Sequence, residues 1–423
     1  MSGAAKRVLV QVNSLELGGT QLNALDFALA VKKHGFESVI FGPDVTLPQG
    51  RTSLLDVAAE RGVDVGVFPV QPSVLAGGAR EFARRAAGVR PDLIHVYGTW
   101  AGERTAYWGP CLLGRRPLVH TVYEMIVSPQ VYRHTPLIVG TGYLLDECKD
   151  RPGLTRLISP PVDLTRDAPG VVDTSAFLAS IGSDPSHTRI GLVSRLDENM
   201  KALSVEAAIN AVADLGDPTV ELLVAGAGSA FARLARLAEE RNALLGRPAI
   251  RLLGALADPR PVYASADLML GMGGSAARAL AFGRPLIVQG ERGTAEVFTE
   301  ATAASLYRRS FWNDIPHPDP ARHLAATIRG VLRDPALRLR SSFARGFAER
   351  NFGLSAMAAR LAGIYEEALR SYGARAWLAD LGLEARALTR QPPFDSDDPR
   401  FWSRSAATTR ASRGAGVSAM GQA

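Results

Sequence analysis

The stretch ADLMLGMGGSAARALAFGRPLIVQG, residues 266–290, decides the fold class of this chain. An apolar run at 268–270 enters a glycine-rich turn, an Ala-rich helical segment follows, and a second apolar run begins after Pro285. This order predicts a βαβ unit with its glycines at the start of the helix. Gly273 and Gly274 leave backbone N–H groups open to a close ligand, and Ser275 is the expected N-cap. A helix N-terminus carries partial positive charge, so the turn suits a diphosphate, although an ordinary tight turn has the same pattern.

The first half of the chain alternates apolar runs with helical patterns. This alternation of continuous apolar strands and helices predicts a doubly wound parallel sheet. The expected strands are 7–13, 39–43, 63–70, 91–98, 117–123 and 136–142. Ligands bind such sheets at the carboxyl ends of the strands. That rule points to Gly18, Gly19, Thr20 and Gln21, to residues 95–100 with Tyr97 and Trp100, to Tyr123 and Glu124, and to Thr141.

A second α/β series starts near residue 189, after a segment at 158–186 that is rich in Pro, Asp, Ser and Gly. We interpret that segment as a linker, and as the hinge of two domains that close on a ligand. The predicted organisation is an N-terminal Rossmann-like domain at 1–165, a C-terminal domain at 186–352, a helix at 353–373 that packs back on the first domain, and a disordered tail at 391–423.

Composition sets limits on function. The net charge is +6, but only 5 of the 48 basic residues are Lys, an Arg bias typical of a GC-rich genome, and no basic run is interleaved with aromatics. We therefore expect no nucleic-acid partner.

Cys111 and Cys148 lack metal-ligand spacing, and we expect buried thiols and no metal. Without an apolar leader or a membrane-length apolar run, we expect a cytoplasmic protein with no integral membrane segment; a homodimer is compatible with this pattern.

Six segments of the second half occur in the order and spacing of a known family. They are RIGLVSRLDENMKALSVEAA, VELLVAGAG, IRLLGAL, YASADLMLGMG, SAARALAFGRPLIV and GTAEVF. The chain resembles the retaining glycosyltransferases of family 4, as a divergent bacterial member, and LELGGTQLNALDFALAV resembles the family's Gly-Gly loop and first helix. The resemblance covers residues 6 to about 372. It implies the GT-B architecture, in which two doubly wound parallel-sheet domains face each other across a cleft.

The resemblance implies how a donor is held. In the family, an Arg after the first strand of the second domain and a Lys a few residues later bind the donor diphosphate, and Arg195 and Lys201 occupy those positions. Two cations suit two phosphates, and they stabilise charge on the leaving group. Solvated surface cations beside Asp197 are the alternative interpretation. Gly18 and Gly19 are expected to bring first-domain amides near the phosphates.

Two departures from the family pattern concern the sugar and ribose end of the site. The family's pair of Glu residues falls on Leu270 and Arg278, and an arginine cannot accept hydrogen bonds from a ribose. We expect Arg278 to contact a phosphate, or else a carboxylate such as Glu296, which itself falls near a donor-facing helix. The position of a frequent family His falls on Tyr123, followed by Glu124, while His120 is expected in the strand itself.

The resemblance implies a retaining glycosyl transfer from a GDP- or UDP-linked sugar to a small-molecule acceptor, with no tightly bound cofactor. We place it in bacterial specialised metabolism of the antibiotic type. The implied mechanism needs no protein nucleophile, because the leaving phosphate oxygen serves as base. Arg195, Lys201, Tyr123 and Glu124 are the expected catalytic residues, and Tyr97 and Trp100 the acceptor side. A non-catalytic nucleotide-binding partner and a nucleotide-sugar epimerase stay open as alternatives.

Overall fold

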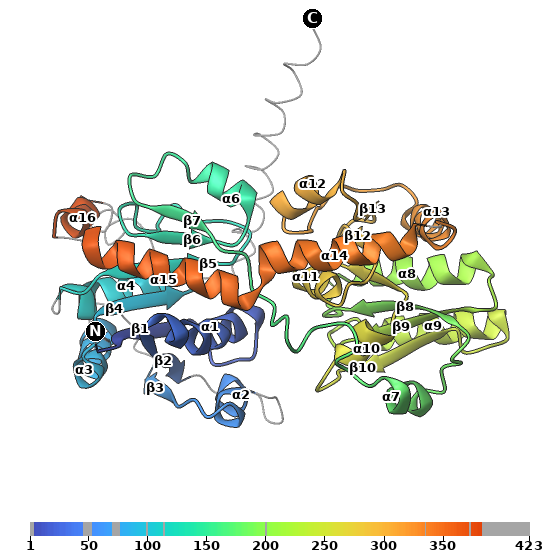
Figure 1. Cartoon of the computed structure of the whole chain (residues 1–423), viewed down its shortest axis with the longest axis horizontal. Helices are drawn as coiled ribbons and strands as arrows, with labels where there is room; N and C mark the ends of the chain where they lie inside the picture. The colour runs from blue at the N-terminus through green and yellow to red at the C-terminus, as the bar shows by residue number, and fades with distance from the viewer. Residues whose placement is uncertain are drawn as a thin grey trace, which may run out of the picture. The chain divides into compact units, whose positions relative to one another are not determined.

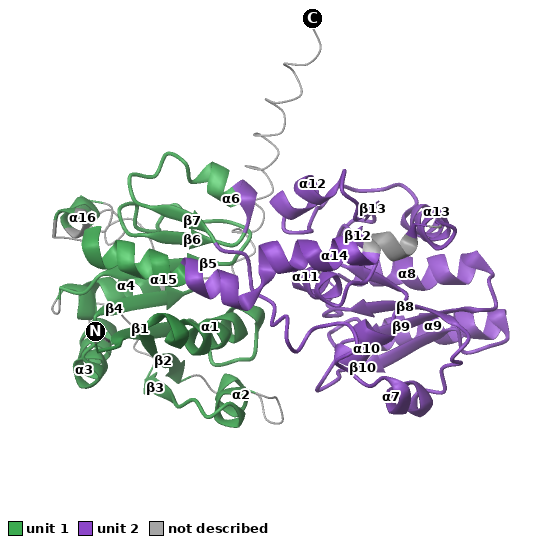
Figure 2. Cartoon of the chain, in the orientation of Figure 1, with its two compact units in different colours: residues 1–140, 144–157, 361–423 green, residues 141–143, 158–360 purple. Residues whose placement is uncertain are grey.

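The computed structural model describes residues 4–44, 53–69, 77–98, 100–112, 115–198, 201–334, 336–371 and 374–382. The tail expected at 391–423 lies outside these residues. The chain divides into two compact units, which Figure 2 colours separately and whose elements Figure 1 labels. Unit 1 comprises residues 1–140, 144–157 and 361–423, and unit 2 comprises residues 141–143 and 158–360.

Unit 1 is built on a seven-stranded sheet in the order β3-β2-β1-β4-β5-β6-β7. All neighbouring strands are parallel. Every residue of β4 and β5 is buried, which explains why these strands have no polar alternation. The strands are β1 (Lys6–Val12), β2 (Phe36–Asp44), β3 (Val65–Pro69), β4 (Leu93–Tyr97), β5 (Leu118–Val122), β6 (Leu137–Val139) and β7 (Thr155–Leu157).

Helices pack on both faces of this sheet. On one face, Phe82 and Tyr107 pack with Leu9 and Ile94 in a single core cluster. On the other, the Tyr365 hydroxyl lies 2.7 Å from Nδ1 of His95. The helices are α1 (Gly19–Ala30), η1 (Val31–His34), α2 (Leu54–Glu60), α3 (Ala79–Val89), α4 (Trp100–Ala106), η3 (Tyr107–Cys111) and α16 (Ala374–Ala379), while α6 (Gly142–Glu147) and α15 (Leu354–Ser371) contain residues of both units.

Unit 2 has a six-stranded sheet in the order β10-β9-β8-β11-β12-β13. Its strands pair in parallel except for β13, which runs antiparallel to β12. The strands are β8 (Thr188–Val193), β9 (Val220–Ala225), β10 (Ile250–Gly254), β11 (Leu268–Gly271), β12 (Leu286–Gln289) and β13 (Ala295–Val297).

Two apolar clusters hold helices to the two faces of the unit 2 sheet. Val205 and Ile209 of α8 and Ile328 of α13 pack with strand residues in one cluster, and Leu280 of α11 and Phe347 of α14 belong to the other. The helices are α7 (Ser175–Ser180), α8 (Ala202–Leu215), α9 (Phe231–Leu245), α10 (Arg260–Ser265), α11 (Gly274–Ala281), α12 (Ala303–Arg308), α13 (Pro320–Leu332) and α14 (Leu337–Phe352).

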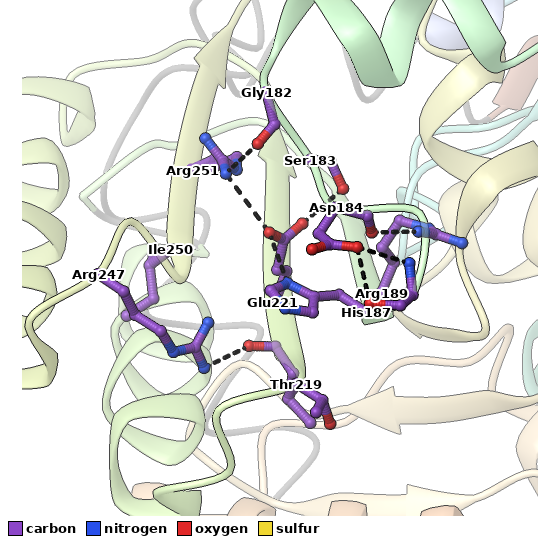
Figure 3. A network of polar contacts seen from close by, with 12 residues as sticks. Gly182, Ser183, Asp184, His187, Arg189, Thr219, Glu221, Arg247, Ile250 and Arg251 are labelled. Carbon is purple, nitrogen blue, oxygen red and sulfur yellow. Dashed lines mark hydrogen bonds and ion pairs between the residues drawn. The ribbon is translucent and has the colours of Figure 1, made fainter.

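The segment expected as a linker, residues 158–186, is part of unit 2. Its later residues are bound to the amino ends of the sheet strands, as Figure 3 shows around Glu221. The buried Glu221 carboxylate accepts a hydrogen bond from Oγ of Ser183 at 2.6 Å and lies 3.0 Å from Nδ1 of His187. Arg251 donates to Glu221 at 3.4 Å and to the Gly182 carbonyl at 2.8 Å. The polar residues at the end of this segment therefore form hydrogen bonds and ion pairs within unit 2, and they do not mark a flexible linker.

The prediction of two doubly wound parallel-sheet domains is confirmed. The strand and helix patterns found the long central elements because their burial leaves a clear apolar signature. They missed β7 and β13, which have three residues each and lie at sheet edges. Among the described residues, no helix combines the length and apolarity that crossing a membrane requires.

Candidate functional site

The glycine turn of unit 2 lies between the end of β11 and the start of α11. Gly273 is the N-cap of α11 with φ +57° and ψ −127°, a conformation that side-chain-bearing residues rarely adopt. A Cβ on Gly271 would lie 3.1 Å from the backbone N of Ala276. At Gly273 and Gly274 an added Cβ would meet no atom within 4 Å, so their backbone is open on that side. Glycine is therefore favoured by conformation at 273, and a Cβ at 271 would crowd the first turn of α11.

Ser275 does not cap this helix, contrary to the sequence prediction. It is the second residue of α11, and its Oγ donates to the Met272 carbonyl at 3.0 Å while accepting the Met272 N–H at 3.2 Å. The hydroxyl thus closes the turn on itself. Because the first N–H groups of a helix have no intrahelical acceptor, this end of α11 keeps donors available for an anion.

The β8–α8 loop carries Arg195 and is fixed by the neighbouring β9–α9 turn. Leu196 donates its N–H to the Ala227 carbonyl at 2.9 Å, and its own carbonyl accepts the Ala230 N–H at 2.8 Å. A Cβ on Gly226 would overlap the Ser194 carbonyl oxygen, and one on Gly228 would overlap that of Leu196. The sequence AGAG at 225–228 is therefore needed for the two loops to approach so closely.

Two cations lie at the carboxyl end of β8. Arg195 is exposed, with Nη1 3.6 Å from Oδ2 of Asp197. Lys201 is the N-cap residue of α8 and is partly buried. Burial lowers the pKa of Lys201, and the charge of Arg195 lowers it further, against the opposite effects of Glu291 and Asp197. The two positive charges therefore repel each other, and an anion bound between them would relieve that repulsion.

A narrow hollow joins the glycine turn to Lys201. Its free volume is about 10 Å³, the space of one water molecule. The structure brings Lys201 and Ser275 together on its wall, whereas Arg195, Gly273 and Gly274 are not among the lining residues. The lining residues are Leu192, Val193, Ser194, Lys201, Ser204, Leu270, Gly271, Met272, Ser275 and Gln289.

Two residues at the end of β12 were missed by the sequence interpretation. Gln289 donates through Nε2 to the Ser204 carbonyl at 3.0 Å and so joins β12 to α8 beside the hollow. Glu291 follows it, and burial raises the pKa of its carboxyl, although a hydrogen bond from Trp312 and the charge of Lys201 lower it. The rule that ligands bind at carboxyl ends of strands, applied to β12, would have found both.

Arg278 and Glu296 have separate protein partners. Nε of Arg278 lies 2.8 Å from Oδ2 of Asp167, whose side chain is 5% exposed. Glu296 pairs instead with Arg309, with 3.2 Å between Oε2 and Nη2. The carboxylate that faces Arg278 is thus Asp167 and not the Glu296 suggested from the sequence. Leu270, at the other family Glu position, is a buried core residue.

The remaining candidate residues belong to unit 1. Gly18 is the N-cap of α1, and a Cβ on it would lie 2.6 Å from Oε1 of Gln21, while Gly19 has open space around it. Tyr97 is 1% exposed, with its ring centroid 4.2 Å from that of His95, so it supports the sheet edge from within the core. Trp100 is the first residue of α4, and its side chain lies outside what the structure describes.

Tyr123 and Glu124 follow directly after β5. The Tyr123 ring centroid lies 6.4 Å from that of Tyr97, and burial raises the pKa of its hydroxyl. Oε2 of Glu124 is buried and has no hydrogen-bond partner among the described residues. Burial raises the pKa of the Glu124 carboxyl, against its own N–H, the charge of His120 and the Tyr123 N–H, which lower it. This oxygen is an unsatisfied acceptor that a ligand hydroxyl or amine would satisfy.

Comparisons with known proteins bear on the fold and on residues 187–334. Residues 187–334 match the family model described as Glycosyl transferases group 1. The structure resembles HepE of Anabaena in complex with UDP, with a TM-score of 0.64 and 18% identity over 85% of this chain and 100% of that one. The fold is GT-B. A search of curated protein sequences finds no significant match.

Two other GT-B structures are similar. A glycosyltransferase from Rickettsia africae has a TM-score of 0.70 and 15% identity, over 87% of this chain and 100% of that one. A putative UDP-N-acetylglucosamine 2-epimerase from Listeria monocytogenes has a TM-score of 0.55 and 15% identity, over 85% of this chain and 95% of that one. The family match and this fold together support a GT-B glycosyltransferase.

Proposed function

We propose that the chain transfers a sugar from a nucleoside-diphosphate sugar to a small-molecule acceptor with retention of configuration. The observation that carries this proposal is the pair Arg195 and Lys201 at the carboxyl end of β8, with Lys201 on the same hollow as the glycine turn before α11. This hollow lies within the part of the chain that matches the glycosyltransferase family model. Two cations and free helix N–H groups form a natural diphosphate site.

In the proposed reaction, the bond between the sugar C1 and the diphosphate oxygen breaks as the nucleophilic atom of the acceptor forms its bond to C1 on the same face. The acceptor proton passes to the leaving phosphate oxygen. Arg195 and Lys201 stabilise the negative charge that develops on the diphosphate. Gly18 and Gly19 contribute backbone N–H groups from unit 1, and the unsatisfied Glu124 oxygen accepts from the acceptor substrate.

The ribose end of the donor needs a hydrogen-bond acceptor, and Arg278 cannot supply one. We assign that role to Glu291, a partly buried carboxyl in electrostatic contact with Lys201. Arg278 then has a structural role through Asp167, and Glu296 of β13 has one through Arg309. UDP is the first nucleotide to test, because HepE binds UDP and UDP-glucose.

The test compares nucleotide binding in the parent and in the double variant Arg195→Ala/Lys201→Ala. Thermal shifts with UDP, GDP and their glucose conjugates identify the base, since a ligand that binds the folded state raises its melting temperature. The exposed Arg236 of α9 provides a matched control through Arg236→Ala. Loss of the shift in the double variant alone supports the proposal, and equal shifts in all three proteins would overturn it.

Turnover separates this proposal from its alternatives. Acceptor-dependent release of nucleoside diphosphate indicates transfer. Formation of a sugar with one inverted stereocentre in the absence of an acceptor indicates an epimerase. Binding with neither product indicates a non-catalytic partner protein. We further propose that the enzyme works in the cytoplasm, in bacterial specialised metabolism; product analysis with panels of small-molecule acceptors addresses the latter directly.

A further inference from the structure

Two fully buried histidines lie on the adjacent central strands of unit 1. Both His95 of β4 and His120 of β5 are 0% exposed. His95 is in register with Val119, and His120 with Val96, so the two imidazoles face opposite sides of the sheet. This placement gives each ring a separate set of partners, and the two sets differ in chemistry.

The partners of His95 are both hydroxyl groups. Its Nδ1 lies 2.7 Å from the Tyr365 hydroxyl of α15, and its Nε2 lies 2.7 Å from Oγ1 of Thr121. A hydroxyl can donate as well as accept, so a neutral ring satisfies both contacts. Burial and the nearby charge of His120 lower the pKa of His95.

The partners of His120 are acceptors. Its Nε2 lies 2.7 Å from the Gly98 carbonyl oxygen, which can only accept. Its Nδ1 lies 3.1 Å from Oε1 of Glu103 on α4. The other oxygen of that carboxylate accepts the Tyr132 N–H at 3.0 Å. The contact between Nδ1 and Glu103 has the distance of an ion pair but not the geometry of a hydrogen bond. A proton on each ring nitrogen suits the carbonyl on one side and the carboxylate on the other.

We propose that His120 is a buried imidazolium that positions the acceptor edge of unit 1, by donating its Nε2–H to the Gly98 carbonyl and by pairing its positive charge with the Glu103 carboxylate. The consequence for catalysis rests on the proposed function. His120 in this state is a positioning residue: it touches no substrate and acts through the turn after β4 and through Glu124.

The turn at Gly98 explains why this contact matters for the edge. Gly98 has φ +105°, and a Cβ there would lie 2.6 Å from the Asn13 side chain. Its N–H donates to the Thr121 carbonyl at 3.0 Å, and its carbonyl accepts from His120. Both backbone groups of the turn are thus bound to β5. Gly98 directly follows Tyr97, the last residue of β4.

Three titratable groups interact with His120. Glu103 faces it from α4, Glu124 from the segment after β5, and His95 from β4. Arg151 is in electrostatic contact with Glu103. Burial lowers the pKa of His120, but Glu103, the Gly98 carbonyl and Glu124 together raise it above the ordinary value. The positive ring in turn favours an ionised Glu124.

The test is nitrogen NMR of the full chain with labelled histidine, at about pH 8, above the ordinary histidine pKa of about 6.5. His95→Gln and His120→Gln assign the two signals, and His95 serves as the internal control in the same spectrum. The expected result is two protonated nitrogens in His120 and one in His95. A singly protonated His120 would overturn the proposal, because the ring beside Glu103 would then be neutral.

A second variant, Glu103→Gln, keeps a hydrogen-bonding group but removes the negative charge. We expect His120 to become neutral at the same pH and kcat to fall, by up to about 100-fold if the edge shifts by an ångström, with the donor KM nearly unchanged. A doubly protonated His120 in Glu103→Gln would contradict the proposed pairing. The nitrogen spectrum needs no turnover, so an inactive protein with an imidazolium refutes the proposed function and not this inference.

Discussion

Nε of Arg278 lies 2.8 Å from Oδ2 of Asp167, and this contact joins helix α11 to the segment at 158–186. The Asp167 side chain is 5% exposed and that of Arg278 is 41% exposed. Arg345 adds to the same junction by donating to the Asp167 carbonyl at 3.0 Å and the Leu164 carbonyl at 3.1 Å. Arg278 lies in the last turn of α11 and not at its start, and its charge is balanced by a carboxylate from a distant part of the sequence.

Replacing Arg278 and replacing Asp167 should lower the free energy of unfolding by different amounts. Burial raises the pKa of Asp167, and the opposing effect of Arg278 does not cancel it. Arg278→Ala leaves a buried carboxylate uncompensated and should lower the free energy of unfolding by about 1–3 kcal/mol. Asp167→Asn should cost less, since it removes the buried charge. Urea unfolding of both single variants and the double variant measures the difference, and equal losses would contradict this account.

Lys201 should make nucleoside-diphosphate affinity depend on pH at alkaline values. Burial and Arg195 lower its pKa, so affinity should be constant while Lys201 is protonated and should fall as pH rises through a midpoint below the ordinary lysine pKa of about 10.4. In Arg195→Ala one cause of the lowering is gone, and the midpoint should move upward. Calorimetric titration with UDP across this pH range measures it. An unchanged midpoint would show that the charge of Arg195 does not lower the pKa of Lys201.

Gly228→Ala should disrupt the loop that carries Arg195. The new Cβ would overlap the Leu196 carbonyl oxygen, so the two loops must separate. Gly246→Ala is the matched control, because Gly246 also has a positive φ, +66°, but has nothing within 4 Å of its added Cβ. We expect a loss of about 1–2 kcal/mol in the control from backbone strain alone. Gly228→Ala should lose more stability and also nucleotide affinity; equal behaviour of the two variants would contradict the close loop contact.

Glu221 should contribute to stability at neutral pH and lose that contribution in acid. Burial alone would raise its pKa, but Ser183, His187 and Arg251 lower it below the ordinary value. Its stabilisation is therefore fully present above the unfolded-state pKa of about 4.3 and is lost as pH falls through the lower folded-state value. Glu221→Gln should reduce neutral-pH stability and flatten the acid dependence of unfolding. Glu206→Gln, at an ion pair with Arg233 that is more than a third exposed, is the control and should change little.

Much of the fold could be predicted because buried strands and helices leave recognisable patterns of apolar residues in the local sequence. The central strands β1, β4, β5, β8, β9 and β11 are apolar runs bounded by turn residues, and their helices carry matching patterns. Gly273 could be proposed as a site residue because a glycine turn at a strand end suits a ligand by a general rule, whereas Lys201 was proposed from the resemblance to a family. That Gly273, and not the expected Ser275, is the N-cap of α11 was not predictable, since it depends on where the backbone leaves β11.

Local sequence thus determined the two parallel α/β units, the glycine turn and the order of the candidate cations, because each depends on residues close together along the chain. Three-dimensional contacts decided the rest. Arg278 meets Asp167 across more than a hundred residues, the 158–186 segment joins unit 2 through Glu221 and Arg345, and the charge of His120 depends on Glu103 and Gly98. The partner of a charged or polar side chain is set by packing between distant segments, and no local pattern encodes it.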